Sequence, residues 1–282
     1  MAGTLFVVAT PIGNLEDITL RALRTLRNVQ LIAAEDTRRT ARLLAHHGIS
    51  TPTLSFHEHN TRSRLPQLLA RLDSGADLAL VTDAGTPGIS DPGTELIRAC
   101  ADGGITVDVI PGPSAPLVAA VASGFPLDPL TILGFPPARA KDRNQWLEEA
   151  GKVPHTFTFF EAPHRITETL HAAGRYFGDR PIIVARELTK LHQEYIRANR
   201  VADIIGQMTT GRGEYTVVIG PQATHADASP TMADSEIATE FGQVAKNGAM
   251  SRRQVVSTLA KKSGRSSREV YAIIERARKL VI

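Results

Sequence analysis

The sequence contains few of the residues that build several common kinds of site. Aromatic residues make up 5% of its 282 residues, with one tryptophan, which argues against an aromatic platform that stacks single-stranded nucleic acid. Cys100 is the single cysteine, so the chain can form neither an internal disulfide nor a cysteine-based metal cluster. No apolar run reaches the roughly 20 residues of a membrane-spanning helix. The first residues, Met-Ala-Gly-Thr, are followed by neither a basic segment nor a long apolar segment. We therefore expect no signal peptide, no membrane partner and a cytoplasmic location.

Motifs that bind pyrophosphate are also missing. The first expected strand is followed by Thr10-Pro-Ile-Gly-Asn14, with proline and isoleucine where a dinucleotide-binding turn has glycines. Glu35 and Asp36 stand at about the spacing at which that motif holds a ribose, but the Walker lysine motif is absent as well. The sequence therefore predicts a ligand site that is not built around a pyrophosphate.

Three expected strands instead run into loops of glycine, proline and small residues, at 7–13, 80–93 and 109–115. Glycine allows a ligand to lie against the main chain, and open α/β sheets bind ligands at the carboxyl ends of their strands. We expect one shared small-molecule site here, suited to a neutral or cationic ligand in a folded shape.

Strand and helix patterns alternate along the first 220 residues. Strands are expected at 4–9, 30–34, 53–56, 77–82 and 106–110, with helices at 18–26, 38–46, 64–72 and 93–101. A second series has strands at 130–135, 157–161, 182–187, 194–196 and 215–219, with helices at 140–150, 163–176 and 201–208. This alternation predicts an α/β fold whose first sheet is mostly parallel. We expect α/β domains at 1–115 and 120–220, a linker at 221–233 and a helical tail domain at 234–282.

The tail combines helical signals with positive charge. Ser251-Arg-Arg-Gln254 and Ser266-Ser-Arg-Glu269 both fit a capping box, and a basic turn is expected at 261–265. Two helices joined by a glycine turn resemble a helix-turn-helix, although a packed helical hairpin is the more common structure. Residues 246–282 carry ten Lys or Arg and two acids. This charge fits either a polyanionic partner or a solvated helical surface.

Charged residues lie at the ends of three strands of the second series: 159–165 and 185–194 come at the exits of two strands, and 211–215 leads into the last one. Facing the three glycine-rich loops, they would form the second wall of a cleft. Two simpler assignments hold elsewhere. His57-Glu-His59 is explained by a polar loop, so we expect no metal site there. Ser114 lacks the surroundings of a nucleophile elbow and is expected to cap the following helix.

Six ordered blocks resemble the tetrapyrrole methylase superfamily, in particular its branch that methylates small-subunit ribosomal RNA. They are Thr10–Asp17, Ala34–Arg38, Asp83–Gly93, Pro111–Ser114, Glu161–Arg165 and Ala185–Lys190. The resemblance implies two α/β domains with S-adenosylmethionine in the cleft between them, no metal, and a homodimer. It implies 2′-O-methylation of a cytidine in the decoding region of 16S rRNA, with the small ribosomal subunit as partner.

The resemblance also implies roles for particular residues. The expected contacts of the methyl donor are Pro11, Asp83, Ala84, Gly85, Thr86, Pro87, Ser114 and Ala115. Here Ala84-Gly-Thr-Pro87 replaces the Gly-Asp-Pro of the wider superfamily. A ribose 2′-OH needs a proton acceptor, for which Glu161, Glu187 and His164 are candidates. If Glu161 and Glu187 are not catalytic, we expect them to pair with Arg165 and Arg186.

Arg38, Arg165 and Arg186 are the expected phosphate anchors, because guanidinium matches phosphate oxygens. Two other functions stay open at this point. One is methylation of a small tetrapyrrole-like substrate, and the other is a non-catalytic nucleic-acid-binding regulator.

Overall fold

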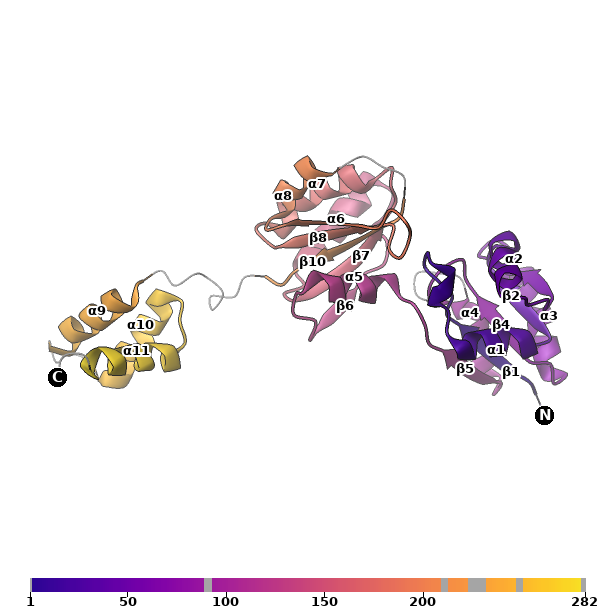
Figure 1. Cartoon of the computed structure of the whole chain (residues 1–282), viewed down its shortest axis with the longest axis horizontal. Helices are drawn as coiled ribbons and strands as arrows, with labels where there is room; N and C mark the ends of the chain where they lie inside the picture. The colour runs from indigo at the N-terminus through magenta and orange to yellow at the C-terminus, as the bar shows by residue number, and fades with distance from the viewer. Residues whose placement is uncertain (1, 89–92, 209–212, 223–231, 247–250, 280–282) are drawn as a thin grey trace. The chain divides into compact units, whose positions relative to one another are not determined.

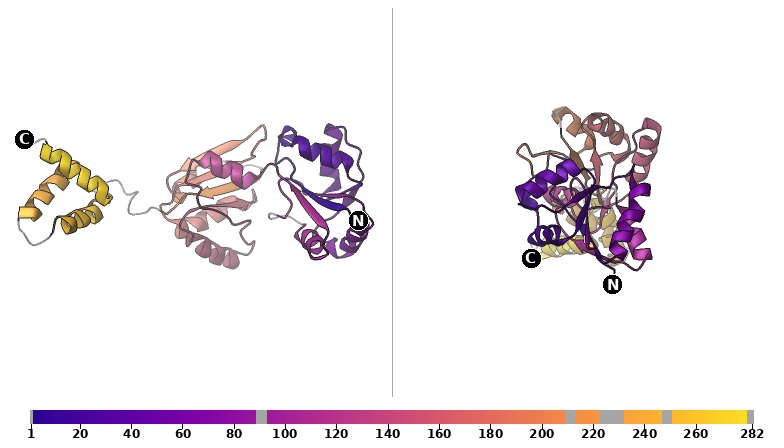
Figure 2. Two further views of the ribbon diagram at one scale, coloured as in Figure 1. Left: turned by 90° about the horizontal axis from the view of Figure 1, so that it is seen from below. Right: turned by 90° about the vertical axis from the view of Figure 1, so that its right-hand side faces the viewer.

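The computed structural model describes residues 2–88, 93–208, 213–222, 232–246 and 251–279. The chain forms two compact units, Met1–Pro221 and Gln222–Ile282. The first unit holds two five-stranded sheets, each with helices on both faces, and we call each sheet with its helices a lobe (Figures 1 and 2).

The sheet of the first lobe is entirely parallel, as the strand–helix alternation predicts. Its order is β3-β2-β4-β1-β5. Its strands are β1 (Thr4–Val8), β2 (Leu31–Ala34), β3 (Thr53–Ser55), β4 (Leu78–Val81) and β5 (Thr106–Ile110). All residues of β2 and β4 are buried, because helices cover both faces. The carboxyl ends of all five strands lie at one edge, and that edge carries the glycine-rich loops.

Two apolar clusters hold helices against this sheet. One face packs α3 (Thr61–Asp73) and α4 (Thr94–Asp102). The other face packs α1 (Leu20–Asn28) and α2 (Thr37–His46), and a 3-10 turn (Leu15–Asp17) precedes α1.

The sheet of the second lobe is mixed, with the order β6-β7-β10-β8-β9. Its strands are β6 (Leu130–Ile132), β7 (Thr156–Glu161), β8 (Ile182–Arg186), β9 (Glu194–Ala198) and β10 (Tyr215–Ile219). β10 runs antiparallel to both β7 and β8. The amino end of β10 therefore lies beside the carboxyl ends of β7 and β8, which brings Glu214 next to Glu187 and Lys190 in the loop after β8.

Helices again cover both faces of this sheet. The larger core packs α6 (Ala140–Gly151), α7 (Ile166–Phe177), α8 (Val201–Ile204) and the 3-10 turn Ile205–Gln207 on one face. On the other face lie α5 (Ala115–Ser123) and Ile12 of the first lobe. The expected helix at 163–176 begins later, at Ile166, after a turn.

The second unit is a three-helix bundle of α9 (Asp234–Lys246), α10 (Arg252–Ser263) and α11 (Ser267–Lys279) around its own apolar core. Both predicted capping boxes form, at Ser251–Gln254 and Ser266–Glu269. The turn expected at 261–265 is shorter than predicted, because α10 continues to Ser263 and ends at Gly264 with φ +66°. Most of the linker expected at 221–233 lies outside the described residues.

Ion pairs reduce the positive charge that the helical unit presents. The acids of α9 bind Lys262, Arg265 and Arg276, and Glu275 binds Arg252. Arg253 and Arg268 are exposed and make no ion pair with a described residue. In the parts of the chain that the structure describes, no helix is long and apolar enough to cross a membrane.

Candidate functional site

A cavity of about 290 Å³ lies in the first unit, lined by loops of one lobe and strand ends of the other. We call it the first cavity. The first lobe and the start of α5 contribute Ile12, the loop 84–86, Ser114 and Ala115, and the second lobe contributes Phe135, Phe160 and Glu161 among others. Its only charged lining residues among those described are two acids, Glu161 and Glu214. An apolar cavity with acids alone suits a neutral or cationic ligand.

Backbone pairing fixes the first-lobe wall. The N–H of Thr10 donates to the Gly85 carbonyl at 2.9 Å, and the N–H of Gly85 donates back to Thr10 at 3.0 Å. The buried Thr10 hydroxyl donates to the carbonyl of Thr82 at 3.1 Å. Gly85 has φ +80°, a conformation that costs other residues about 1–2 kcal/mol. The loops after β1 and β4 are thereby held together where they face the first cavity.

Ser114 stands at the N-cap position of α5, as predicted, but its hydroxyl makes no capping bond. It lines the first cavity instead, next to Ala115. Gly112, two residues earlier, allows a close approach, since an added Cβ would lie 2.9 Å from that of Ala9. Small residues in this loop therefore bring the start of α5 against the end of β1.

Glu161 lies at the end of β7 and is 1% exposed. One carboxylate oxygen accepts from the N–H of Ala162 at 2.7 Å and from Arg165 Nε at 2.8 Å. The other accepts from the Thr169 hydroxyl at 2.6 Å. The predicted pair with Arg165 is present. Three donors occupy most of the accepting positions of a carboxylate, so Glu161 lines the cavity with little free capacity to take a proton.

Glu187 does not pair with Arg186, contrary to the sequence-based expectation. Arg186 binds Glu194 instead, while Glu187 binds Lys190 at 2.8 Å and accepts from the N–H of Glu214 at 3.1 Å. The reason is the backbone of Glu187, whose φ of +50° turns the chain out of β8. Burial alone would raise the pKa of Glu187, but these two bonds and the positive charges of Lys190 and Arg186 outweigh it and hold the pKa below its ordinary value. A lowered pKa makes Glu187 a weaker proton acceptor.

A second cavity of about 470 Å³ adjoins the first, and Ile12, Ala84 and Glu214 line both. It also contains the side chains of Arg39, Arg42, Asp83 and Lys190. Of these, sequence reasoning assigned a role only to Asp83.

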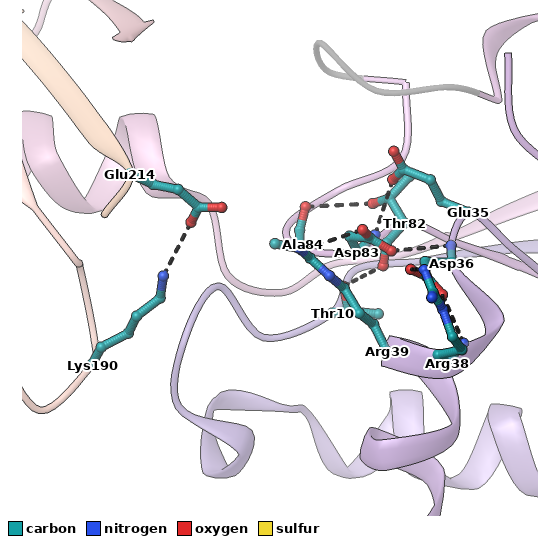
Figure 3. A network of polar contacts seen from close by, with 10 residues as sticks. All are labelled: Thr10, Glu35, Asp36, Arg38, Arg39, Thr82, Asp83, Ala84, Lys190 and Glu214. Carbon is teal, nitrogen blue, oxygen red and sulfur yellow. Dashed lines mark hydrogen bonds and ion pairs between the residues drawn. The ribbon is translucent and has the colours of Figure 1, made fainter. Parts of the chain in front are cut away.

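Hydrogen bonds between side chains and backbone connect three acids at the ends of β2 and β4, namely Glu35, Asp36 and Asp83 (Figure 3). The carboxylate of Glu35 accepts from the N–H of Asp83, and the carboxylate of Asp83 accepts from the N–H of Asp36, both at 3.1 Å. Asp83 also binds Arg39 at 3.3 Å. Burial raises the pKa of Asp83 above its ordinary value, against the opposing effects of Arg39 and the Asp36 N–H. Burial raises the pKa of Glu35 as well.

The structure separates the predicted site residues into three groups. Those that line the first cavity are Ala84, Gly85, Thr86, Ser114, Ala115 and Glu161. Those that line the second are Pro11, Asp83 and, again, Ala84. Those that line neither cavity are Pro87, Arg38, His164, Arg165, Arg186 and Glu187.

Two of the predicted site residues that line neither cavity lie at the surface. Arg38 is exposed and folds back onto Asp36 at 2.9 Å. His164 is exposed. Among the described residues, no group of three His, Cys, Asp or Glu could hold a metal ion.

Residues 4–204 match the family model of the tetrapyrrole (corrin/porphyrin) methylases. The chain belongs to the tetrapyrrole methylase family. The resemblance carried by the six sequence blocks is thereby confirmed. Solved structures with this fold include the cobalt precorrin-4 methyltransferase CbiF, with a TM-score of 0.58 at 19% identity over 77% of this chain and 94% of that chain. The uroporphyrin III C-methyltransferase of Thermus thermophilus has a TM-score of 0.55 at 17% identity over 77% and 97%.

Curated relatives of this methylase share much more sequence. The ribosomal RNA small subunit methyltransferase I of Synechocystis is 41% identical over 273 residues, which cover 96% of this chain and 97% of the relative. The protein of the same name from Thermotoga maritima is 48% identical over 219 residues, which cover 77% of this chain but 98% of the relative. The whole Thermotoga protein is therefore about as long as the first unit of this chain.

Proposed function

We propose that the chain transfers a methyl group from S-adenosylmethionine to the ribose 2′-oxygen of a cytidine in the decoding region of 16S rRNA. The observation that carries most weight is the similarity, along nearly the whole chain, to proteins named ribosomal RNA small subunit methyltransferase I. The family supports methyl transfer, and the two adjoining cavities offer places for a donor and an acceptor.

The first cavity fits S-adenosylmethionine by its chemistry. Bound there, this group would supply an electrophilic methyl on a positively charged sulfur. The described lining residues of the cavity include no lysine or arginine, so a cationic ligand would meet no positive charge in the cavity wall. The rings of Phe135 and Phe160, with centroids 5.1 Å apart, offer apolar surface. Its volume of about 290 Å³ lies just below the usual range for ligand pockets, about 300–1,000 Å³.

In the transfer, the 2′-oxygen forms a bond to the methyl carbon while the carbon–sulfur bond breaks and sulfur keeps the electron pair. The hydroxyl proton leaves to an acceptor. Glu161 has most of its accepting positions filled, and the pKa of Glu187 is lowered. Both facts favour a structural role for the two acids, so alignment of the reactants is expected to supply much of the rate, on the order of 7–11 kcal/mol at best.

The proposal is tested by incubating the protein with labelled donor and either assembled 30S subunits or naked 16S rRNA, and mapping the methyl group. A labelled ribose on a decoding-region cytidine supports it. Label on a base, or on no RNA at all, contradicts it. The related structures named for tetrapyrrole substrates make a uroporphyrin the useful third substrate in the same assay.

Replacing Gly85 with valine should strongly reduce donor binding, measured by calorimetry. The cause is backbone strain rather than a steric clash, because an added Cβ would come no closer than 3.8 Å to Ile12, while φ is +80°. A β-branched residue resists this conformation, so the pairing with Thr10 should break. Gly104→Val is the matched control, with φ +70° in an open turn between α4 and β5. Wild-type donor affinity in Gly85→Val would count against the assignment of the first cavity.

We further propose a homodimer that uses the outer face of α5. Leu117 and Val121, one helical turn apart, are 50% and 71% exposed, and together they form an apolar face on α5 that a second copy would cover. Replacing both with aspartate should yield monomers by sedimentation, because a charge would be buried at the contact. Leu191→Asp, at a fully exposed loop position, should leave the dimer intact. A wild-type monomer, or a double variant that still dimerises, would refute this interface.

A further inference from the structure

The two cavities of the first unit share one wall and differ in charge. Ile12, Ala84 and Glu214 line both cavities, and the Thr10–Gly85 pairing holds the first two in place. The charged lining residues of the first cavity are acids. Those of the second are three cations, Arg39, Arg42 and Lys190, against two carboxylates. The second cavity therefore suits an anionic ligand, and the first cavity suits a neutral or cationic one.

Ion pairs fix two of the three cationic side chains that line the second cavity, Lys190 and Arg39. Lys190 Nζ lies 2.8 Å from Glu187. It also lies 3.3 Å from Glu214, and this second pair is drawn in Figure 3. Burial would lower the pKa of Lys190, but these two carboxylates raise it above its ordinary value, so the side chain stays charged. Arg39 is fixed by Asp83 at 3.3 Å. Because both carboxylates that line the cavity are already paired, a bound anion would not face an unpaired acid.

The loop that carries Lys190 is attached to the first lobe. The N–H of Asn14 donates to the Thr189 hydroxyl at 3.0 Å. An added Cβ on Gly13 would lie 2.5 Å from Lys190 Cγ and 2.7 Å from the Leu188 carbonyl. Glycine at 13 thus allows this loop to lie directly against the β1 loop, where Lys190 faces the same cavity as Arg39 and Arg42.

Arg42 is the cation best suited to bind a ligand. It lies on α2 one turn after Arg38 and three residues after Arg39, it is exposed, and it lines the second cavity. It forms no ion pair with any residue in the described ranges. A guanidinium without an acidic partner is free to make bidentate contacts with phosphate oxygens.

We propose that the second cavity binds the ribose-phosphate of the nucleotide to be methylated, with Arg42 and Lys190 contacting its phosphates and Arg39 supporting them. The inference rests on the proposed function, since it places the acceptor RNA beside the donor cavity. It places the phosphate contacts on other residues than the expected Arg38, Arg165 and Arg186, because those three line neither cavity.

The test measures equilibrium binding of the full-length protein to 30S subunits over a range of salt concentrations. Arg42→Ala and Lys190→Ala should each weaken binding about tenfold and reduce the slope of log affinity against log salt by about 1. Donor affinity by calorimetry should stay unchanged in Arg42→Ala, because Arg42 lines only the second cavity. Arg42→Lys should recover part of the loss, since it keeps the charge but not the bidentate geometry.

Arg98→Ala is the matched control, because Arg98 lies on α4 in an exposed pair with Asp102 and lines neither cavity. If wild type methylates 30S subunits and both cavity variants bind as Arg98→Ala does, the inference is wrong while the proposed function stands. If wild type neither binds nor methylates any RNA offered, the proposed function fails and the inference with it. Arg42→Ala alone decides the case if Lys190→Ala proves unstable, because the exposed Arg42 has no structural partner among the described residues.

Discussion

Replacing Glu161 with glutamine should destabilise the protein by about 3 kcal/mol, near the low end of the cost of breaking a buried ion pair. The carboxylate is fully buried, while the side chain of Arg165 is 17% exposed and can still reach some water. Glutamine keeps the shape but cannot accept from Arg165, Ala162 and the Thr169 hydroxyl together. Chemical denaturation measures the change in the free energy of unfolding.

The same variant separates a structural role from a catalytic one. If Glu161 acts mainly through Arg165, the double variant Glu161→Gln, Arg165→Gln should lose less stability than the sum of the single variants. The single-turnover methylation rate should then fall only as far as donor affinity falls. Glu149→Gln is the control, since its exposed pair with Lys152 is worth at most about 1 kcal/mol. A rate loss above about a hundredfold with normal stability and donor affinity would instead make Glu161 the proton acceptor.

Much of the fold follows from hydrophobic pattern. The sequence predicts β5 and β10 with the bounds that the structure has, because each is a short run rich in β-branched residues that ends at a glycine or proline. Errors occur where backbone geometry changes without a change in polarity. The strand expected at 130–135 ends at Ile132, since Gly134 adopts φ +71° and interrupts regular pairing.

Individual site residues were harder to predict than the loops that carry them. Arg38 and Arg39 are adjacent, yet successive residues on a helix point about 100° apart. One therefore turns to Asp36 in solvent and the other to Asp83 in the second cavity. Arg186 and Glu187 are adjacent as well, but Glu187 leaves β8 with φ +50°, so Arg186 binds Glu194 while Glu187 binds Lys190. Sequence spacing alone could not resolve either choice.

Lys190 and Glu214 illustrate a different limit of sequence reasoning. They are 24 residues apart and meet because β10 runs antiparallel to β8, which brings the start of one strand to the end of the other. Strand alternation predicted an α/β lobe but not this strand order. Sequence reasoning singled out the charged segment that contains Glu214, whereas the position of Glu214 in the lining of both cavities required the sheet topology.

Removal of residues 231–282 should leave donor binding nearly intact and weaken binding to 30S subunits. The first unit has its own cores, and the Thermotoga relative, matched over 98% of its length, spans only 77% of this chain. Both observations favour the first unit as the place of the chemistry. The tail would bind additional phosphates, so its removal should also reduce the salt dependence of binding, because fewer counterions are released.

Arg253 and Arg268 allow this prediction to be tested in the full-length chain. Both are exposed and lie outside the ion pairs of the helical unit, so changing both to glutamine should keep its apolar core and its capping boxes. We expect the double variant to reduce the slope of log affinity against log salt by up to about 2, because each arginine would neutralise one phosphate. Lys262→Gln is the comparison, because Lys262 is paired with Glu240 and its loss should change the salt dependence of binding less.

If both the truncated protein and the double variant bind and methylate 30S subunits as wild type does at every salt concentration, the tail has no role in RNA docking. If the truncated protein aggregates while the double variant behaves as wild type, the three helices serve to cover an apolar surface instead.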